Sequence, residues 1–132
     1  MRRFLLDTNI CIFFNKGVRG LREKLAVIGI SNCAISEITY TELLFGVEKS
    51  DHRYKNLLTL EQFMTDIEML SIGPAIPVFA KEKARLQLAG ASIDNFDLLI
   101  GATAIHHNMT LVTNNTRHFE RLQGIRLEDW TK

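Results

Sequence analysis

The sequence predicts an α/β sandwich around a mainly parallel sheet. Short apolar runs of strand length alternate along the chain with longer segments whose apolar residues recur at helical spacing. This alternation is typical of parallel strands covered by helices. The 132 residues, 46% of them hydrophobic, suffice for a buried core and suit one domain over residues 1–132.

The first half of the chain predicts two strands and four helices. Apolar runs end at Leu6 and Ile35, and each is followed by a residue that suits the start of a helix, Asp7 or Ser36. Gly46 fits the position just after a helix. The expected elements are a strand at 3–6, helices at 9–15 and 20–28, a strand at 33–35, and helices at 36–46 and 51–66.

The second half predicts three strands and two helices. Pro74 and Pro77 suit the opening of a helix, and Gly90 suits its end. The expected elements are a strand at 67–72, helices at 74–88 and 96–107, and strands at 109–113 and 125–127.

Composition narrows the class of protein. No apolar run approaches the roughly 18 residues that a membrane-spanning helix needs, and the three apolar residues before Asp7 are too few for a signal peptide. Cys11 and Cys33 have no CxxC spacing, which favours neither a disulfide framework nor a zinc site. We therefore expect a reduced, cytoplasmic protein. With a net charge of only +1, any contact with nucleic acid must come from a local basic patch.

Asp7 is the most informative residue for function. It follows the apolar run Phe4-Leu5-Leu6, so the first strand ends on a carboxylate. Ligands of open parallel sheets bind just beyond the carboxyl ends of the strands, and a carboxylate there suits a hard cation such as Mg²⁺. The alternative is that Asp7, with Thr8 after it, only begins the following helix, because Asp and Thr are both good N-caps.

Glu42 is expected to face the body of the protein. It lies four residues after Ile38 and three before Phe45, so it shares their face of the helix. Burying an ionised carboxylate is unfavourable unless a cation or hydrogen-bond donors compensate it. The alternative is that Ile38 is only half-buried and Glu42 edges into solvent.

Asp97 is expected in the first turn of its helix, where the helix dipole favours a negative charge. The dipole alone explains an acidic residue there. However, Gly101 and Ala104 follow on the same face, and small residues allow the helix to approach the sheet edge closely. That edge is where Asp7 is expected.

The fourth predicted strand passes abruptly from apolar to small polar residues. Leu111-Val112-Thr113 is followed by Asn114-Asn115-Thr116, which lies near Asp7 if the two strands are neighbours. Its hydroxyl and amide groups can orient water or hold a carboxylate. An ordinary turn, in which Asn and Thr satisfy the backbone, explains the composition nearly as well.

Four collinear blocks carry a resemblance to a known family. They are LLDTNI at 5–10, ITYTELLFGV at 38–47, FDLLIGATA at 96–104 and LVTNNTRHF at 111–119. Together they resemble the PIN-domain ribonucleases, and specifically the VapC toxins of bacterial toxin–antitoxin modules. The closing GIRLEDW at 124–130 is similar to the end of many members. The resemblance implies a PIN-like three-layer α/β/α sandwich around a small, mainly parallel sheet.

The resemblance implies roles for the matching residues. Asp7, Glu42 and Asp97 become the catalytic, metal-binding carboxylates, and Thr113 and Asn115 match polar residues at the strand end, with Thr8 beside Asp7. His118 departs from the family, because many relatives have Asp or Glu at its position. An imidazole there suits Mn²⁺ better than Mg²⁺, which implies a weakened or shifted second metal site. Asp94 either compensates for the missing acid or caps the helix, and we favour the cap.

The implied activity is that of an endoribonuclease toxin that uses Mg²⁺, with Mn²⁺ as an alternative. Bound metal lowers the pKa of water and neutralises charge on the scissile phosphate. The resemblance implies RNA substrates such as tRNA or other structured RNA, inhibition of translation, homodimers, and silencing by a VapB-type antitoxin in a larger assembly. No membrane partner is expected. Among the basic residues, Lys16 and Arg117 adjoin segments at strand ends, so we expect them nearest the site as RNA contacts.

Two other functions compete with this interpretation. An apolar strand ending in Asp-Thr also opens haloacid dehalogenase phosphotransferases and receiver domains. The former usually carry a second Asp where this chain has Asn9, and both usually need a later Lys, which is absent between Lys83 and Lys132. The second alternative is a catalytically weak or inert PIN domain that serves as a binding module. His118, in place of the usual acidic residue, would then mark the loss of catalytic activity.

Overall fold

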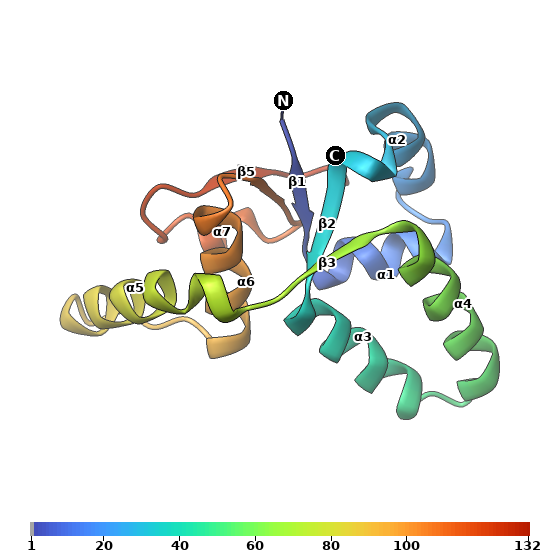
Figure 1. The fold of residues 1–132 in the computed structure, drawn as a ribbon, viewed down its shortest axis with the longest axis horizontal. Coiled ribbons are helices and arrows are strands. Elements are labelled where there is room, and N and C mark those ends of the chain that lie inside the picture. Colours follow the sequence, from blue (N-terminus) through green and yellow to red (C-terminus); the bar gives the residue numbers. More distant parts are fainter. Residues whose placement is uncertain (1) are drawn as a thin grey trace.

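Strand β1 (Phe4–Leu6) lies at the centre of the sheet and pairs in parallel with β2 (Cys33–Ser36) on one side and β4 (Thr110–Val112) on the other. The structure is a computed structural model that describes residues 2–132. The sheet order is β3-β2-β1-β4-β5, and the outer pairs are parallel too (Figure 1). The outer strands are β3 (Glu68–Leu70) and β5 (Arg126–Glu128).

Helices cover both faces of the sheet, so the predicted three-layer α/β/α sandwich is confirmed (Figure 1). Four helices gather on one side, in the right-hand half of the view, and three gather on the other. The first group is α1 (Thr8–Lys16), α2 (Leu21–Ile28), α3 (Glu37–Glu48) and α4 (Arg53–Asp66). The second group is α5 (Ile76–Leu88), α6 (Asn95–His106) and α7 (Thr116–Phe119). Within residues 2–132 no helix has both the length and the apolar character to span a bilayer.

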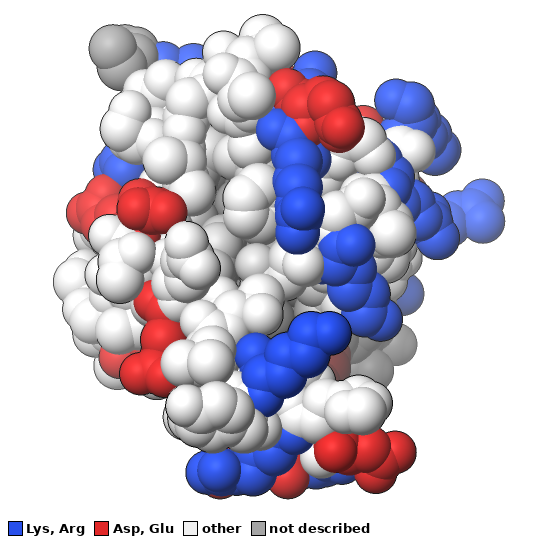
Figure 2. All heavy atoms as spheres, turned by 90° about the vertical axis from the view of Figure 1, so that its right-hand side faces the viewer, with Lys and Arg blue, Asp and Glu red and all other residues white. Residues whose placement is uncertain are grey.

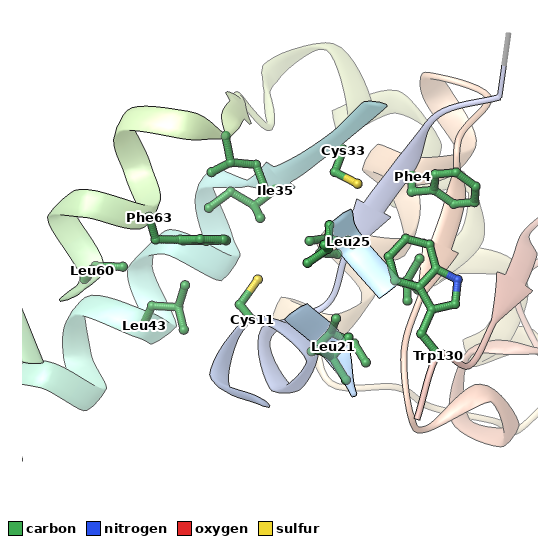
Figure 3. Close-up of a cluster of buried hydrophobic side chains, with 14 of the residues drawn as sticks. Phe4, Cys11, Leu21, Leu25, Cys33, Ile35, Leu43, Leu60, Phe63 and Trp130 are labelled. Atoms are coloured by element: carbon green, nitrogen blue, oxygen red, sulfur yellow. The ribbon is translucent and has the colours of Figure 1, made fainter. Parts of the chain in front are cut away.

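The core is divided in two by the alternation of side chains along the strands. Phe4 and Leu6 belong to the cluster beneath α1 to α4, whereas Leu5 belongs to the cluster beneath α5 and α6. Trp130 closes the first cluster with its ring edge-on to Phe4 at 5.0 Å between centroids (Figure 3). Because three successive residues of β1 are buried, the strand holds Asp7 at a fixed place at the end of the sheet.

Two buried thiols lie in the first cluster. Cys11 and Cys33 are free cysteines among apolar side chains (Figure 3). Burial raises the pKa of the Cys33 thiol to about 11 and raises that of Cys11 well above its usual range. Both therefore act as small apolar core residues at neutral pH.

Every expected strand and helix is present, with bounds shifted by at most two residues. The helix expected to end near Gly46 runs to Glu48, because Val47 is buried in the same core cluster as Leu43. The helix expected from Pro74 begins at Ile76, after a 3₁₀ turn over Gly73–Ala75. Helix α7, four residues long, was not expected from the sequence, because a single turn has too few residues to show a helical period.

Gly101 has a different role from the one expected. It is buried, but the close approach that it permits is to Leu122, in the segment after α7, rather than to the sheet edge. A Cβ atom on Gly101 would lie 2.3 Å from Cδ1 of Leu122, whose side chain is 2% exposed. Ala104, one turn further on, does pack in the cluster that contains Leu5.

The replacement Gly101→Ala is expected to lower the free energy of unfolding by about 1 kcal/mol. Overpacking a filled core costs about 1–3 kcal/mol, while exchanging Gly for Ala inside a helix returns about 0.5–1 kcal/mol. Urea denaturation measures the difference. The matched control is Gly46→Ala in α3, where an added Cβ meets no atom within 4 Å and where stability should rise. If Gly101→Ala instead stabilises the protein, the prediction is wrong and the side chain of Leu122 moves aside at little cost in free energy.

Candidate active site

Asp7 directly follows β1 and is the N-cap of α1. Its Oδ1 accepts a hydrogen bond from the backbone N–H of Thr8 at 2.8 Å, and its Oδ2 accepts one from the hydroxyl of Thr113 at 2.8 Å. The backbone N–H of Asp7 donates to the carbonyl of Val112, the last residue of β4. The carboxylate is thus fixed between the ends of two adjacent strands.

Burial makes the charge on Asp7 unfavourable. The residue is only 7% exposed, and desolvation is the main reason why the pKa of its carboxyl is raised. The charge of Asp97 raises this pKa further, while the bonds from Thr113 and Thr8 and the nearby His118 partly oppose the rise. A cation beside Asp7 would offset both the desolvation and the repulsion.

Glu42 lies at the border of the buried face of α3. That face runs through Thr39, Leu43 and Val47, so Glu42 is half-buried and Phe45 points to solvent with 64% exposure. The expectation that Phe45 shares a core face with Glu42 is therefore wrong. Glu42 nevertheless faces the site, because its Oε1 accepts a hydrogen bond from the hydroxyl of Thr8 at 2.6 Å.

Asp97 lies in the first turn of α6, and Asp94 caps that helix as expected. The Oδ2 of Asp94 accepts from the backbone N–H groups of Phe96 and Asp97 at 3.1 and 3.3 Å. The Oδ2 of Asp97 is 3.0 Å from Nε2 of His118 on α7. Burial raises the pKa of the Asp97 carboxyl, with smaller increases from the charges of Asp94 and Glu42, while His118 lowers it.

The two polar residues after β4 have different roles. Thr113 is fully buried and holds Asp7. The side chain of Asn115 is exposed, and its backbone N–H donates to the Thr113 hydroxyl at 3.0 Å. Between them, Oδ1 of Asn114 is buried with no hydrogen-bond partner within residues 2–132. Sequence reasoning did not single out Asn114, because an Asn in a polar loop carries no distinctive signal.

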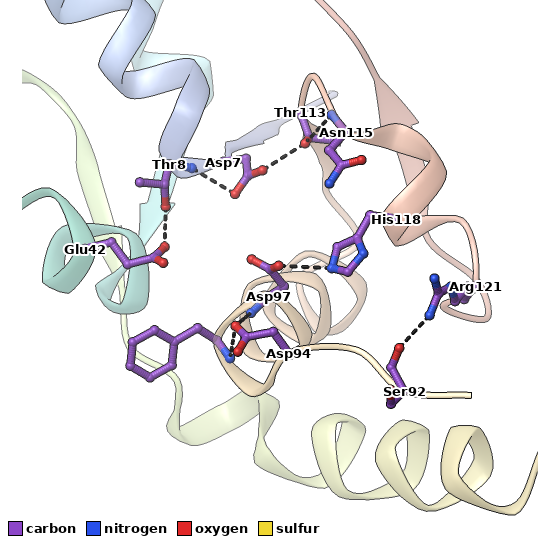
Figure 4. Close-up of polar contacts among 11 residues, drawn as sticks. Asp7, Thr8, Glu42, Ser92, Asp94, Asp97, Thr113, Asn115, His118 and Arg121 are labelled. Carbon is purple, nitrogen blue, oxygen red and sulfur yellow. Dashed lines mark hydrogen bonds and ion pairs between the residues drawn. The ribbon is translucent and has the colours of Figure 1, made fainter. Parts of the chain in front are cut away.

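Three carboxylates from distant parts of the sequence extend toward one space. Asp7 comes from the end of β1, Glu42 from α3 and Asp97 from α6, with His118 beside Asp97 (Figure 4). Each carboxylate is held by its own neighbour, Thr113, Thr8 or His118. No three His, Cys, Asp or Glu side chains of residues 2–132 already stand in a group that could hold a metal ion.

The chemistry of these side chains nevertheless fits a divalent cation. Mg²⁺ and Mn²⁺ prefer oxygen ligands, which carboxylates supply. A bound cation would also relieve the repulsion between the carboxylates. The repulsion is visible in the way that Asp97 raises the pKa of Asp7, and Glu42 that of Asp97. The unpartnered Oδ1 of Asn114 adds a further buried oxygen in the loop after β4.

The two basic residues expected near the site belong to α1 and α7. Lys16 is exposed at the end of α1 and lines the same hollow as Glu42. Arg117 is exposed on α7, next to His118.

The PIN domain family matches residues 4–125 of this chain. The chain belongs to the PIN-domain family. Its curated relatives include the tRNA(fMet)-specific endonuclease VapC of Shigella flexneri, which is 38% identical over 99% of this chain and 100% of that protein. Ribonuclease VapC2 of Rickettsia felis is 36% identical over 98% of both chains. The predicted membership of the VapC group of PIN domains is therefore confirmed.

A solved structure shows the same PIN fold over nearly the whole chain. DNA-bound VapBC from Salmonella typhimurium superposes with a TM-score of 0.91 at 38% identity, covering 98% of this chain and 99% of that one. The phosphotransferase and receiver-domain alternatives are thereby excluded as the family of this chain.

Proposed function

We propose that this protein is a metal-dependent endoribonuclease, the toxin of a VapBC-type toxin–antitoxin module, which hydrolyses phosphodiester bonds in RNA and thereby inhibits translation. The observation that carries the proposal is the convergence of Asp7, Glu42 and Asp97 on one space in a PIN domain (Figure 4). The name of the Shigella flexneri relative, a tRNA(fMet)-specific endonuclease, supports tRNA or another structured RNA as the substrate class.

Asp7, Glu42 and Asp97 are the residues proposed to hold Mg²⁺, or Mn²⁺ in its place. When bound, such an ion supplies an activated water and neutralises charge on the scissile phosphate. Thr113 and Thr8 orient Asp7 and Glu42 through the hydrogen bonds described above, and His118 orients Asp97. Lys16 and Arg117 are proposed to contact phosphates of the RNA on either side of these carboxylates.

The proposed partners follow from the relatives. VapBC from Salmonella typhimurium was solved as a complex, which supports a VapB-type antitoxin as the inhibitor of this chain. We propose a homodimer that enters a larger assembly with that antitoxin, in the cytoplasm.

Cleavage of total bacterial RNA by the purified, antitoxin-free protein tests the function. The reactions contain Mg²⁺, Mn²⁺ or EDTA, and circular dichroism confirms that the protein is folded. Discrete fragments that require metal are expected. A folded protein that cleaves nothing in either metal would instead be the inert PIN domain that acts as a binding module.

The variant His118→Glu is expected to shift the metal preference toward Mg²⁺. An imidazole nitrogen beside Asp97 favours Mn²⁺, whereas a carboxylate favours the harder Mg²⁺. Competition of Mg²⁺ against bound Mn²⁺, followed by the electron paramagnetic resonance signal of free Mn²⁺, should become about tenfold more effective in the variant. His106→Glu, at an exposed residue at the end of α6, is the control. Equal competition in all three proteins would exclude His118 from the metal centre.

A further inference from the structure

A groove runs from the candidate active site across helices α1 and α4. Two hollows, of about 570 and 520 Å³, share the lining residues Asn15, Lys55 and Thr59 and therefore adjoin each other. Glu42 and Lys16 line the first hollow, and Arg22 lines the second. We call this feature the α1–α4 groove.

The α1–α4 groove carries more positive than negative charge away from the active site. Lys16, Lys55 and Arg22 line it, whereas Asp66 is the acidic residue of the far hollow. Figure 2 shows Lys and Arg side chains gathered across the face of the molecule formed by the right-hand side of Figure 1, where α4 lies. The side-chain amide and hydroxyl groups of Asn15, Asn56 and Thr59 supply uncharged hydrogen-bonding groups to the same walls.

The basic side chains that line the groove differ in whether other groups hold them in place. The guanidinium of Arg22 is fixed at the carboxyl end of α1, where Nε donates to the carbonyl of Phe14 at 3.1 Å and Nη2 to that of Asn15 at 3.0 Å. Helix dipoles favour a positive charge at this end. In contrast, within residues 2–132 neither Lys16 nor Lys55 forms an ion pair with a carboxylate. Two unpaired ammonium groups thus face the hollow that Glu42 also lines, and one oriented guanidinium faces the adjoining hollow.

We propose that the α1–α4 groove binds the phosphate backbone of the RNA strand that leads away from the scissile phosphate, with Lys55 and Arg22 as its phosphate contacts. The inference rests on the proposed function. The groove begins at a candidate catalytic carboxylate, so a strand that is cut at the site lies at its mouth. Beside apolar side chains such as Ile12 and Phe63, its walls carry cations and neutral donors and acceptors. Proteins use such polar groups to follow a nucleic-acid backbone without reading its sequence.

Salt-dependent RNA binding by Lys55→Gln tests the groove. The probe is a fluorescein-labelled single-stranded RNA of about 20 nucleotides, followed by anisotropy in EDTA between about 50 and 200 mM NaCl. The control is Lys81→Gln, which removes the same charge from an exposed residue of α5. Lys55→Gln is expected to weaken binding several-fold and to reduce the slope of log Ka against log [NaCl] by about 0.7, the value for one lost phosphate contact on a single strand.

The outcomes separate this inference from the proposed function when cleavage by the unaltered protein is assayed in parallel. If that protein cleaves RNA but Lys55→Gln and Lys81→Gln share its salt slope, the groove proposal is overturned and the nuclease stands. If it does not cleave RNA but Lys55→Gln alone loses slope, the groove stands and the nuclease fails. Displacement of the RNA by polyglutamate as effectively as by unlabelled RNA would show that the groove binds an acidic protein segment and overturn the proposal.

Discussion

Replacing Asp7 by Asn is expected to lower RNA cleavage at least about 10²-fold and also to stabilise the metal-free protein. Loss of one essential group in an active site typically lowers activity by about 10²–10⁴-fold. The stability effect has the opposite sign because the Asp7 carboxyl is buried and its pKa is raised in the folded state. Ionised Asp7 therefore destabilises the fold, and Asn removes the charge while retaining an oxygen that can accept from the N–H of Thr8.

The pH dependence of this stabilisation follows from the direction of the shift. As pH rises above the ordinary aspartate value of about 4, the unfolded chain loses this proton before the folded protein does, so the unfavourable contribution of Asp7 grows. Thermal unfolding in EDTA should show a gain from Asp7→Asn that is larger at neutral pH than near pH 4. Asp51→Asn, at an exposed position before α4, should alter neither cleavage nor melting. A destabilised Asp7→Asn would mean that the hydrogen bond from Thr113 outweighs the burial of charge.

Features encoded within a few neighbouring residues were predictable from the sequence. Asp7 could be placed at a strand end because Phe4, Leu5 and Leu6 are all apolar, and the structure buries all three. The cap at Asp94 likewise depends on residues within three positions of it. The resemblance to the PIN-domain family predicted which carboxylates, far apart in the sequence, lie close together. The spacing of neighbouring residues does not predict this.

Features that depend on how distant segments rotate against one another were not predictable in this way. Phe45 shares a helical period with Glu42, but the orientation of α3 is set by Leu43 and Val47 packing on the core. The contact between His118 and Asp97 requires α7, a single turn whose position depends on the chain beyond it. That chain is held by Leu122 against Gly101 and by a buried carboxylate on α5.

Glu82 is that carboxylate, and sequence reasoning overlooked it because it stands between Lys81 and Lys83 in what reads as a solvated helix face. It is only 4% exposed. Its Oε1 accepts from the backbone N–H of Gln123 at 2.7 Å and from Nη2 of Arg85 at 2.8 Å, while Oε2 accepts from Nε of Arg85 at 3.0 Å. The same Nη2 donates to the carbonyl of Arg121 at 2.7 Å. Glu82 and Arg85 thus join α5 to the segment that follows α7.

Replacing Glu82 by Ala is expected to lower the free energy of unfolding at neutral pH by about 2–3 kcal/mol. The N–H of Gln123 loses its charged acceptor, which costs about 1.5–3 kcal/mol for a hydrogen bond to a charged group. The pair with Arg85 adds little, because the Arg85 side chain is 37% exposed and solvent screens it. Urea denaturation measures the loss, and Glu61→Ala, at an exposed residue of α4, should change stability by less than about 0.5 kcal/mol.

The pH profile separates the role of the Glu82 charge from simple loss of packing. The pKa of Glu82 is lowered, chiefly by the hydrogen bond from Arg85. Burial opposes this shift, and the hydrogen bond from the N–H of Gln123 adds to it. The stability that depends on this charge is therefore complete above the ordinary glutamate value of about 4.3 and disappears as pH falls through the lower folded value. The difference between the unaltered protein and Glu82→Ala should shrink as the solution is acidified over that interval. A difference that stays constant with pH would show that Glu82 acts only by filling space.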